Sequence, residues 1–163
     1  MDALELELRS ESLKAFNAAR QALEHLPKER AVTILEDLAK ESKANLRSRA
    51  ITELGRISKE RCEPLTIRFL SDKDPLVRVS AVYSVGKLEM TSGVPLLIDM
   101  LQNDPDDVVR SWTATVLGQL GTESALAALR VAASHDRGTD HEGRPIREIA
   151  VKAISKIEER TKR

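Results

Sequence analysis

The stretch DPLVRVSAVYSVGKL, residues 74–88, is followed by the similar stretch DDVVRSWTATVLGQL, residues 106–120. Each contains one arginine, and the two arginines, Arg78 and Arg110, are 32 residues apart. A related stretch lies upstream, where Arg47 precedes Arg78 by 31 residues. Internal similarity at a fixed period of about 20 to 50 residues is typical of repeat proteins. The sequence therefore predicts a chain built from repeated units.

Each repeat is predicted to contain two helices. Val77, Ala81 and Val82 recur at the spacing of one helix face. A second apolar run follows Pro64 in one repeat and Pro95 in the next. Since proline is favoured at the first helical position, we expect the second helices to begin at these prolines. A period of 31 residues leaves no room for strands.

A glycine is predicted to end the first helix of each repeat. Gly55, Gly86 and Gly118 hold equivalent positions, each eight residues after its arginine. Glycine is common at helix ends because it adopts the left-handed conformation without strain. This position also accounts for the string GQLG at 118–121, which otherwise resembles a glycine-rich phosphate-binding loop.

We therefore predict an all-α fold, an α-solenoid in which each two-helix unit packs against its neighbours within one domain of residues 1–163. The stretch ALELELR at 3–9 is expected to form a helical extension. The predicted parts are four units at about 11–42, 44–72, 75–103 and 106–134, an inserted loop at 134–145, and a capping helix at 145–160.

The string Asp-Pro-x-Val-Arg-x-x-Ala-x-x-x-Val-Gly at 74–86 resembles a HEAT repeat, and the short period resembles the phycobilisome-lyase type of HEAT-like repeat. The resemblance is good over 44–134 and loose on either side. In HEAT repeats, aspartate and arginine side chains form a hydrogen-bonded ladder between neighbouring repeats. The resemblance implies a structural ladder, rather than a phosphate-binding row, at Asp74, Arg78, Asp106, Arg110, Arg47 and Arg147, where the last two arginines lack a matching aspartate.

Composition excludes several classes of partner. The chain has 26 basic and 26 acidic residues and only 2% aromatic residues, and this composition argues against nucleic acid as a partner. No apolar run approaches the roughly 18 residues needed to cross a membrane. The single cysteine, Cys62, excludes an internal disulfide, fits a reducing compartment and is expected to be buried. The predicted location is cytoplasmic.

The sequence contains no P-loop, no dinucleotide-binding fingerprint and no nucleophile-elbow motif. We therefore expect no catalysis and no cofactor. His135 and His141 lie in the inserted loop among several carboxylates, and they are a weak candidate for a metal site. The alternative is a solvated loop.

The second helices of HEAT repeats line a concave face, which the resemblance makes the expected binding surface. Ile67 and Ile98 hold equivalent positions among charged residues, and an apolar centre with a polar rim is typical of protein interfaces. The alternative is that both isoleucines turn into the core. The predicted partner-binding residues are Asp37, Ile67, Arg68, Ile98, Asp99, Gln102 and Arg130.

Trp112 is a second candidate for partner binding. It aligns with Arg49 and Ser80, at a position expected to face solvent, and an exposed tryptophan is a typical interface hot spot. Tyr83 is expected nearby. The alternative is that the loop at 134–145 folds over Trp112.

Together these observations favour a scaffold or adaptor, monomeric or homodimeric, that binds a partner protein on its concave face. Resemblance to the phycobilisome-lyase type implies a second hypothesis, a factor that attaches or detaches a bilin chromophore. A third hypothesis is an inhibitor or immunity-type protein that caps one partner. The sequence leaves these three open.

Overall fold

The computed structural model describes residues 3–121 and 123–162. Within these residues the chain forms ten α-helices and two short 3₁₀ helices, and extended backbone pairs only in an isolated bridge between Thr139 and Pro145. No helix in the described residues is long and apolar enough to span a membrane. The fold is an all-α repeat solenoid, and α1 (Ala3–Leu8) is the helical extension expected from ALELELR.

Contacts along the chain divide it into two compact units, Met1–Thr66 and Ile67–Arg163. In the first unit α1 packs on α2, and α3 packs on α4. Leucines from each of these helices, among them Leu8, Leu23, Leu35 and Leu54, are fully or almost fully buried. The helices that follow α1 here are α2 (Leu13–Leu23), α3 (Lys28–Leu38), α4 (Ala44–Ile57) and the first part of α5 (Lys59–Phe69).

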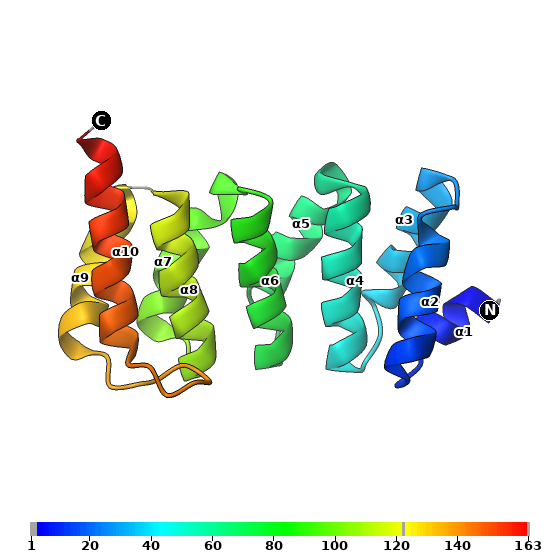
Figure 1. Cartoon of the computed structure of the whole chain (residues 1–163), viewed down its shortest axis with the longest axis horizontal. Helices are drawn as coiled ribbons and strands as arrows, with labels where there is room; N and C mark the ends of the chain where they lie inside the picture. The colour runs from blue at the N-terminus through cyan, green and yellow to red at the C-terminus, as the bar shows by residue number, and fades with distance from the viewer. Residues whose placement is uncertain (1–2, 122, 163) are drawn as a thin grey trace. The chain divides into compact units, whose positions relative to one another are not determined.

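The second unit contains two layers of helices. Figure 1 shows α6, α8 and α10 side by side in one layer, with α7 and α9 in the layer behind them. Small and branched apolar residues such as Ala81, Val82 and Ala114 fill the space between them and are fully buried. The helices are α6 (Pro75–Lys87), α7 (Val94–Asn103), α8 (Asp107–Leu120), α9 (Leu126–His135) and α10 (Ile146–Thr161).

Aspartate side chains cap the N-terminal ends of α6 and α8. The Oδ1 atom of Asp74 accepts a hydrogen bond from the Leu76 amide at 3.0 Å, and Oδ1 of Asp106 accepts one from the Val109 amide at 3.0 Å. Each N-cap of this kind stabilises a helix by about 1 kcal/mol, because the first amides of a helix have no partner within it.

The prediction that the repeated glycine ends each first helix is wrong. Gly55, Gly86 and Gly118 all lie inside helices, and α8 ends instead at Gly121, whose φ of 71° is left-handed. A Cβ atom at Gly118 would lie 2.6 Å from the Cβ of Ala153. Glycine is therefore required at 118 because α8 and α10 approach each other too closely for a side chain.

The predicted start of one second helix is also wrong. Pro95 lies in the first turn of α7, as expected, but Pro64 lies inside α5, which begins at Lys59. The Cys62 amide already donates to the Ser58 carbonyl at 3.0 Å, so the helical hydrogen-bond pattern is established before Pro64 is reached. The apolar stripe of α5 begins with Cys62, which is fully buried, and this burial favours the earlier start.

Candidate functional site

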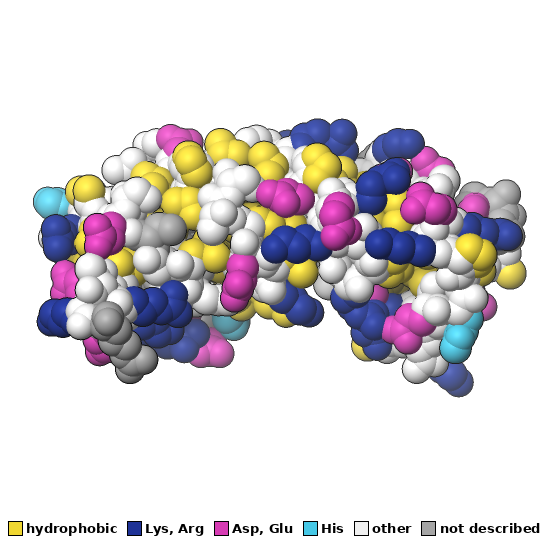
Figure 2. Space-filling model, turned by 90° about the horizontal axis from the view of Figure 1, so that it is seen from above, with side chains coloured by type: hydrophobic (Ala, Val, Ile, Leu, Met, Phe, Trp, Pro, Cys, Tyr) yellow, Lys and Arg dark blue, Asp and Glu magenta, His cyan; other side chains and the backbone are white. Residues whose placement is uncertain are grey.

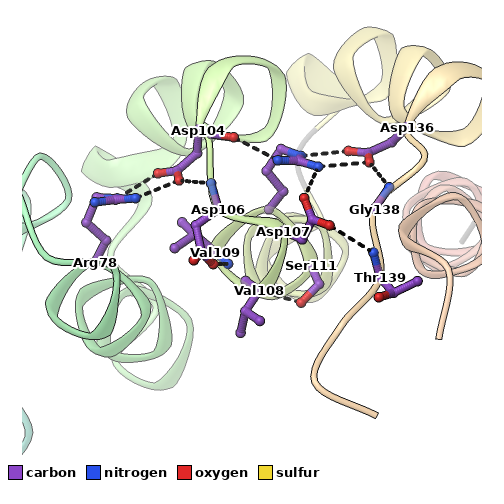
Figure 3. Close-up of polar contacts among 11 residues, drawn as sticks. Arg78, Asp104, Asp106, Asp107, Val108, Val109, Ser111, Asp136, Gly138 and Thr139 are labelled. Carbon is purple, nitrogen blue, oxygen red and sulfur yellow. Dashed lines mark hydrogen bonds and ion pairs between the residues drawn. The ribbon is translucent and has the colours of Figure 1, made fainter. Parts of the chain in front are cut away.

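Buried arginines connect the turns between repeats in the second unit. The side chain of Arg78 donates from Nε to Asp104 Oδ2 at 2.7 Å and from Nη2 to Asp104 Oδ1 at 2.8 Å (Figure 3). Its Nη1 donates to the carbonyl of Asp72 at 3.0 Å, in the preceding turn. Since only 11% of the Arg78 side chain is exposed, this charge depends on its protein partners.

The same arrangement recurs one repeat later. Arg110 donates from Nε to Asp136 Oδ2 at 2.8 Å and from Nη1 to the carbonyl of Asp104 at 2.9 Å. The hydrogen bond with Asp136 is the main reason that the pKa of Arg110 is raised above its usual value, although burial acts in the opposite direction. In the first unit Arg47 donates to the carbonyl of Ser42 at 2.6 Å. We call Arg78, Arg110, Asp104 and Asp136 the ladder.

The resemblance assigned the wrong aspartates to the ladder. Asp74 and Asp106 cap helices, whereas Asp104 and Asp136 follow the second helices and bind the arginines. The sequence contains a signal for the correct residues, because Asp72, Asp104 and Asp136 are spaced by 32 residues (72 to 104, 104 to 136). Each also accepts a hydrogen bond from the amide two residues later, as aspartates in turns commonly do.

Arg147 does not join the ladder, contrary to the expectation. It is exposed on α10 and has no ion pair or hydrogen-bond partner within the described part of the chain. Arg78 and Arg110 reach an aspartate at the end of the second helix that follows them. No second helix follows α10 in residues 123–162, and so Arg147 has no equivalent carboxylate to reach.

The predicted binding residues on the second helices hold equivalent positions in the second unit. Most are exposed, whereas Ile67 and Ile98 are half-buried, and Ile67 Cδ1 would lie 3.3 Å from a Cβ added at Gly93. Both isoleucines therefore contribute to the core as well as to the surface. We call this set the second-helix face, with three rows: Arg68, Asp99 and Val131; Ile67, Ile98 and Arg130; Ser71, Gln102 and Ser134.

Val131 was missed by the sequence reasoning, although it follows Asp99 by the repeat interval of 32 residues. Its side chain is 52% exposed, which makes it the most exposed apolar residue of the face. Two charged members have local partners: Asp99 accepts from Asn103 at 2.7 Å, and Arg130 forms an ion pair with Glu158 at 3.2 Å. Asp37 belongs to the first unit, where it is exposed and pairs with Lys40 at 2.7 Å.

A cleft of about 290 Å³ lies on the other layer of the second unit, between α8, α10 and the inserted loop. Trp112 lines it and is half-buried, and the ring of Tyr83 meets Trp112 edge to face with the centroids 6.0 Å apart. Asp140 and His141 of the loop line the same cleft. Trp112 is therefore neither fully exposed nor covered, since the loop lies beside it and forms one wall.

The side chain of Asp140, which is only 7% exposed, fixes the conformation of the inserted loop from within. This carboxylate accepts from the backbone amides of Glu142 and Arg144 at 2.9 Å each and from Arg144 Nε at 2.6 Å. Burial alone would raise the pKa of Asp140, but these hydrogen bonds keep it below its usual value. At the start of the loop the Thr139 amide donates to Asp107 at 3.4 Å, which ties the loop to α8.

The two loop histidines do not converge on a common site. His135 is exposed and its Nδ1 contacts the Val131 carbonyl at 3.3 Å, whereas His141 lies 3.6 Å from Glu142. The described residues contain no group of three or more histidine, cysteine, aspartate or glutamate side chains placed to hold a metal ion.

Comparison with known proteins identifies the repeat. The family of HEAT repeats matches residues 32–116 and 94–162, which is more than half of the chain, and this match does not test the resemblance to the phycobilisome-lyase type. No curated protein matches the chain. The crystal structure of an engineered protein, a structural-genomics target, is similar in fold, with a TM-score of 0.58 and 18% identity over 96% of this chain and 78% of that one. The chain belongs to the HEAT-repeat family.

Proposed function

We propose that this protein is a non-catalytic scaffold that binds a partner protein through the second-helix face. HEAT repeats generally serve as protein-interaction scaffolds, and this family membership supports the general role. The observation that carries the specific proposal is the composition of the face itself. Half-buried Ile67 and Ile98 lie beside exposed residues of both charges, Arg68 and Asp99, and beside exposed Val131.

This composition suits a protein surface better than it suits nucleic acid or a small molecule. Protein interfaces combine an apolar centre with a polar rim, and charges of both signs select a partner with the complementary pattern. The ladder joins α6 to the turn after α7 and α8 to the turn after α9. The exposed side chains of α7 and α9 therefore lie on helices whose ends are held in place. Little conformational entropy is then lost when a partner binds.

The test is capture of partners by the tagged protein from its host, read by mass spectrometry and repeated with the variant Asp99→Arg. The substitution reverses an exposed charge at the centre of the face and leaves the core untouched. We expect the bound partner to be reduced at least about fivefold, because an exposed charge pair contributes up to about 1 kcal/mol and reversal adds repulsion. Ile98→Glu should weaken binding further.

Lys87→Glu is the matched control, since it reverses an exposed charge on α6 of the other layer. Circular dichroism establishes that each variant remains helical. Equal loss of partner with Lys87→Glu and Asp99→Arg would contradict the assignment of the face. A visible absorbance band on the purified protein, with no stoichiometric partner, would instead favour the chromophore-handling hypothesis.

A further inference from the structure

The cleft between α8 and α10 has no role in the proposed binding at the second-helix face, which lies on the other layer of helices. Two lysines one helical turn apart, Lys152 and Lys156, line it from α10. Within residues 3–121 and 123–162 neither lysine takes part in an ion pair. Seen from above, basic side chains gather beside the C-terminal end of α10 (Figure 2). Unpaired basic charges in a cleft favour an acidic ligand.

The cleft also has an apolar part with rigid support. Trp112 lines it from α8, between the hydroxyl side chains of Ser111 and Thr115, and Ile149 lines it from α10, the helix that also carries the two lysines. The rings of Trp112 and Tyr83 pack edge to face, and this contact restricts the rotation of the Trp112 indole. The close approach of Gly118 to Ala153 fixes the distance between the two helices. An apolar side chain could therefore pack on Trp112 without rearrangement of the walls.

The acidic residues of the cleft do not cancel the lysines. Asp140 is neutralised by Arg144, to which it is bound at 2.6 Å. Glu148 lines the end of the cleft nearest the loop, one turn before Lys152 and two turns before Lys156. The charged groups that line the cleft are therefore Arg144, Lys152 and Lys156 against Asp140 and Glu148, which leaves an excess of positive charge. Beyond Lys156, Arg160 donates to the Gln119 carbonyl, and Glu159 lines the same groove.

We propose that this cleft binds an acidic, extended segment of a partner protein. One apolar side chain of the segment packs against Trp112, and its carboxylates pair with Lys152 and Lys156. The inserted loop forms the wall that closes the cleft at its other end. The proposal adds a second docking surface to the molecule, on the layer of helices opposite the second-helix face.

Trp112 is the only tryptophan of the chain, so its fluorescence reports directly on the cleft. The probe is a capped ten-residue peptide of glutamates with one central leucine, titrated at low salt. We expect a saturable change of fluorescence below about 1 mM peptide, a range typical of weak peptide recognition. The same peptide with glutamine in place of every glutamate should bind at least about tenfold more weakly, because it cannot pair with lysines.

The double variant Lys152→Glu and Lys156→Glu should lower affinity for the acidic peptide at least about tenfold, since two attractions become repulsions. Arg147→Glu is the control on the same helix, because Arg147 does not line the cleft, although it shares a neighbouring groove with Lys152; it should lower affinity much less than the double variant does. Equal affinity for the glutamine peptide, or unchanged affinity in the double variant, would overturn the proposal. Tighter binding of a ten-nucleotide oligothymidylate than of the acidic peptide would also overturn it, in favour of a nucleic-acid site.

Discussion

Replacement of Asp104 by asparagine tests the ladder at its centre. The Asp104 carboxylate accepts two hydrogen bonds from Arg78 at 2.7 and 2.8 Å and one from the Asp106 amide at 3.0 Å. Its side chain is 5% exposed and that of Arg78 is 11% exposed. Asparagine has nearly the same shape, so the substitution removes the charge and one acceptor without creating a cavity.

The size of the effect follows from what Arg78 retains. Removing one partner of a buried ion pair costs about 3–5 kcal/mol, because the remaining charge is left uncompensated. Asparagine still offers one oxygen, and the Asp72 carbonyl still accepts from Arg78 Nη1. The remaining exposure of Arg78 also admits some water. We therefore expect Asp104→Asn to lower the free energy of unfolding by about 2–3 kcal/mol, which is less than the cost of removing a buried partner completely.

Urea unfolding followed by circular dichroism measures this change, and Asp99→Asn is the matched control. Asp99 lies on α7, which Asp104 directly follows, and it is exposed and accepts a hydrogen bond from Asn103, so its replacement should cost less than about 0.5 kcal/mol. If Asp104→Asn shifts the unfolding midpoint no more than Asp99→Asn does, the ladder does not stabilise the fold and the reasoning fails.

Three further predictions concern single residues. Asp136→Asn should lower stability near neutral pH, and the difference from wild type should shrink as the pH falls below about 4. Burial alone would raise the pKa of Asp136, but hydrogen bonds from Arg110 and the Gly138 amide lower it below the usual 3.8. The stabilisation by the Asp136 carboxylate is therefore lost only when the carboxylate protonates. Gly118→Ala should lower the unfolding temperature, at a cost of about 1–3 kcal/mol, because its Cβ would meet the Cβ of Ala153 at 2.6 Å and its backbone Cα at 2.7 Å. Gly86→Ala should cost less, because its Cβ would meet only side-chain atoms, the Val116 methyls at 2.9 and 3.2 Å and Gln119 Oε1 at 3.3 Å. The Cys62 thiol is fully buried and its pKa is raised by burial, so a thiol reagent should modify it only after denaturation, and rapid labelling of the native protein would refute this.

The sequence predicted the all-α repeat fold because each repeat solves the same local problem with the same residues. Apolar residues at the spacing of one helix face, as at Val77 and Ala81, must be buried against a neighbouring repeat, and both are fully buried. The aspartate that begins α6 and the proline that begins α7 are local signals too. These features depend on neighbours a few residues away, which a single sequence displays directly.

Features that depend on distant contacts were predicted less well. Gly118 occupies a position compatible with a helix end, and only the approach of α10, 35 residues away at Ala153 (118 to 153), gives its real role. The ladder aspartates were misassigned because the motif resemblance matched the aspartate four residues before each arginine, whereas Arg110 meets Asp136 only once α9 has folded between them. The Trp112 cleft could not be predicted either, since three separate segments build it and the inserted loop has no counterpart in the other repeats.

The ladder and the inserted loop are connected, and this connection explains how the loop can form a wall. Asp136 ends α9 and is the last ladder carboxylate, and its Oδ1 also accepts from the Gly138 amide at 2.8 Å (Figure 3). A Cβ at Gly138 would lie 2.6 Å from the Asp107 carboxyl carbon and 2.7 Å from Arg110 Nη2, so a larger residue would displace these two side chains, whereas glycine lets the loop pass this close to α8. The loop therefore begins at a fixed point of the scaffold, and its far end is tied back to that point because the Ile146 amide donates to the Gly138 carbonyl at 3.0 Å. An insertion attached in this way adds a defined wall beside Trp112 without disturbing the packing between repeats. The repeats supply the support, and a short polar insertion supplies the feature that distinguishes this surface from that of the other repeats.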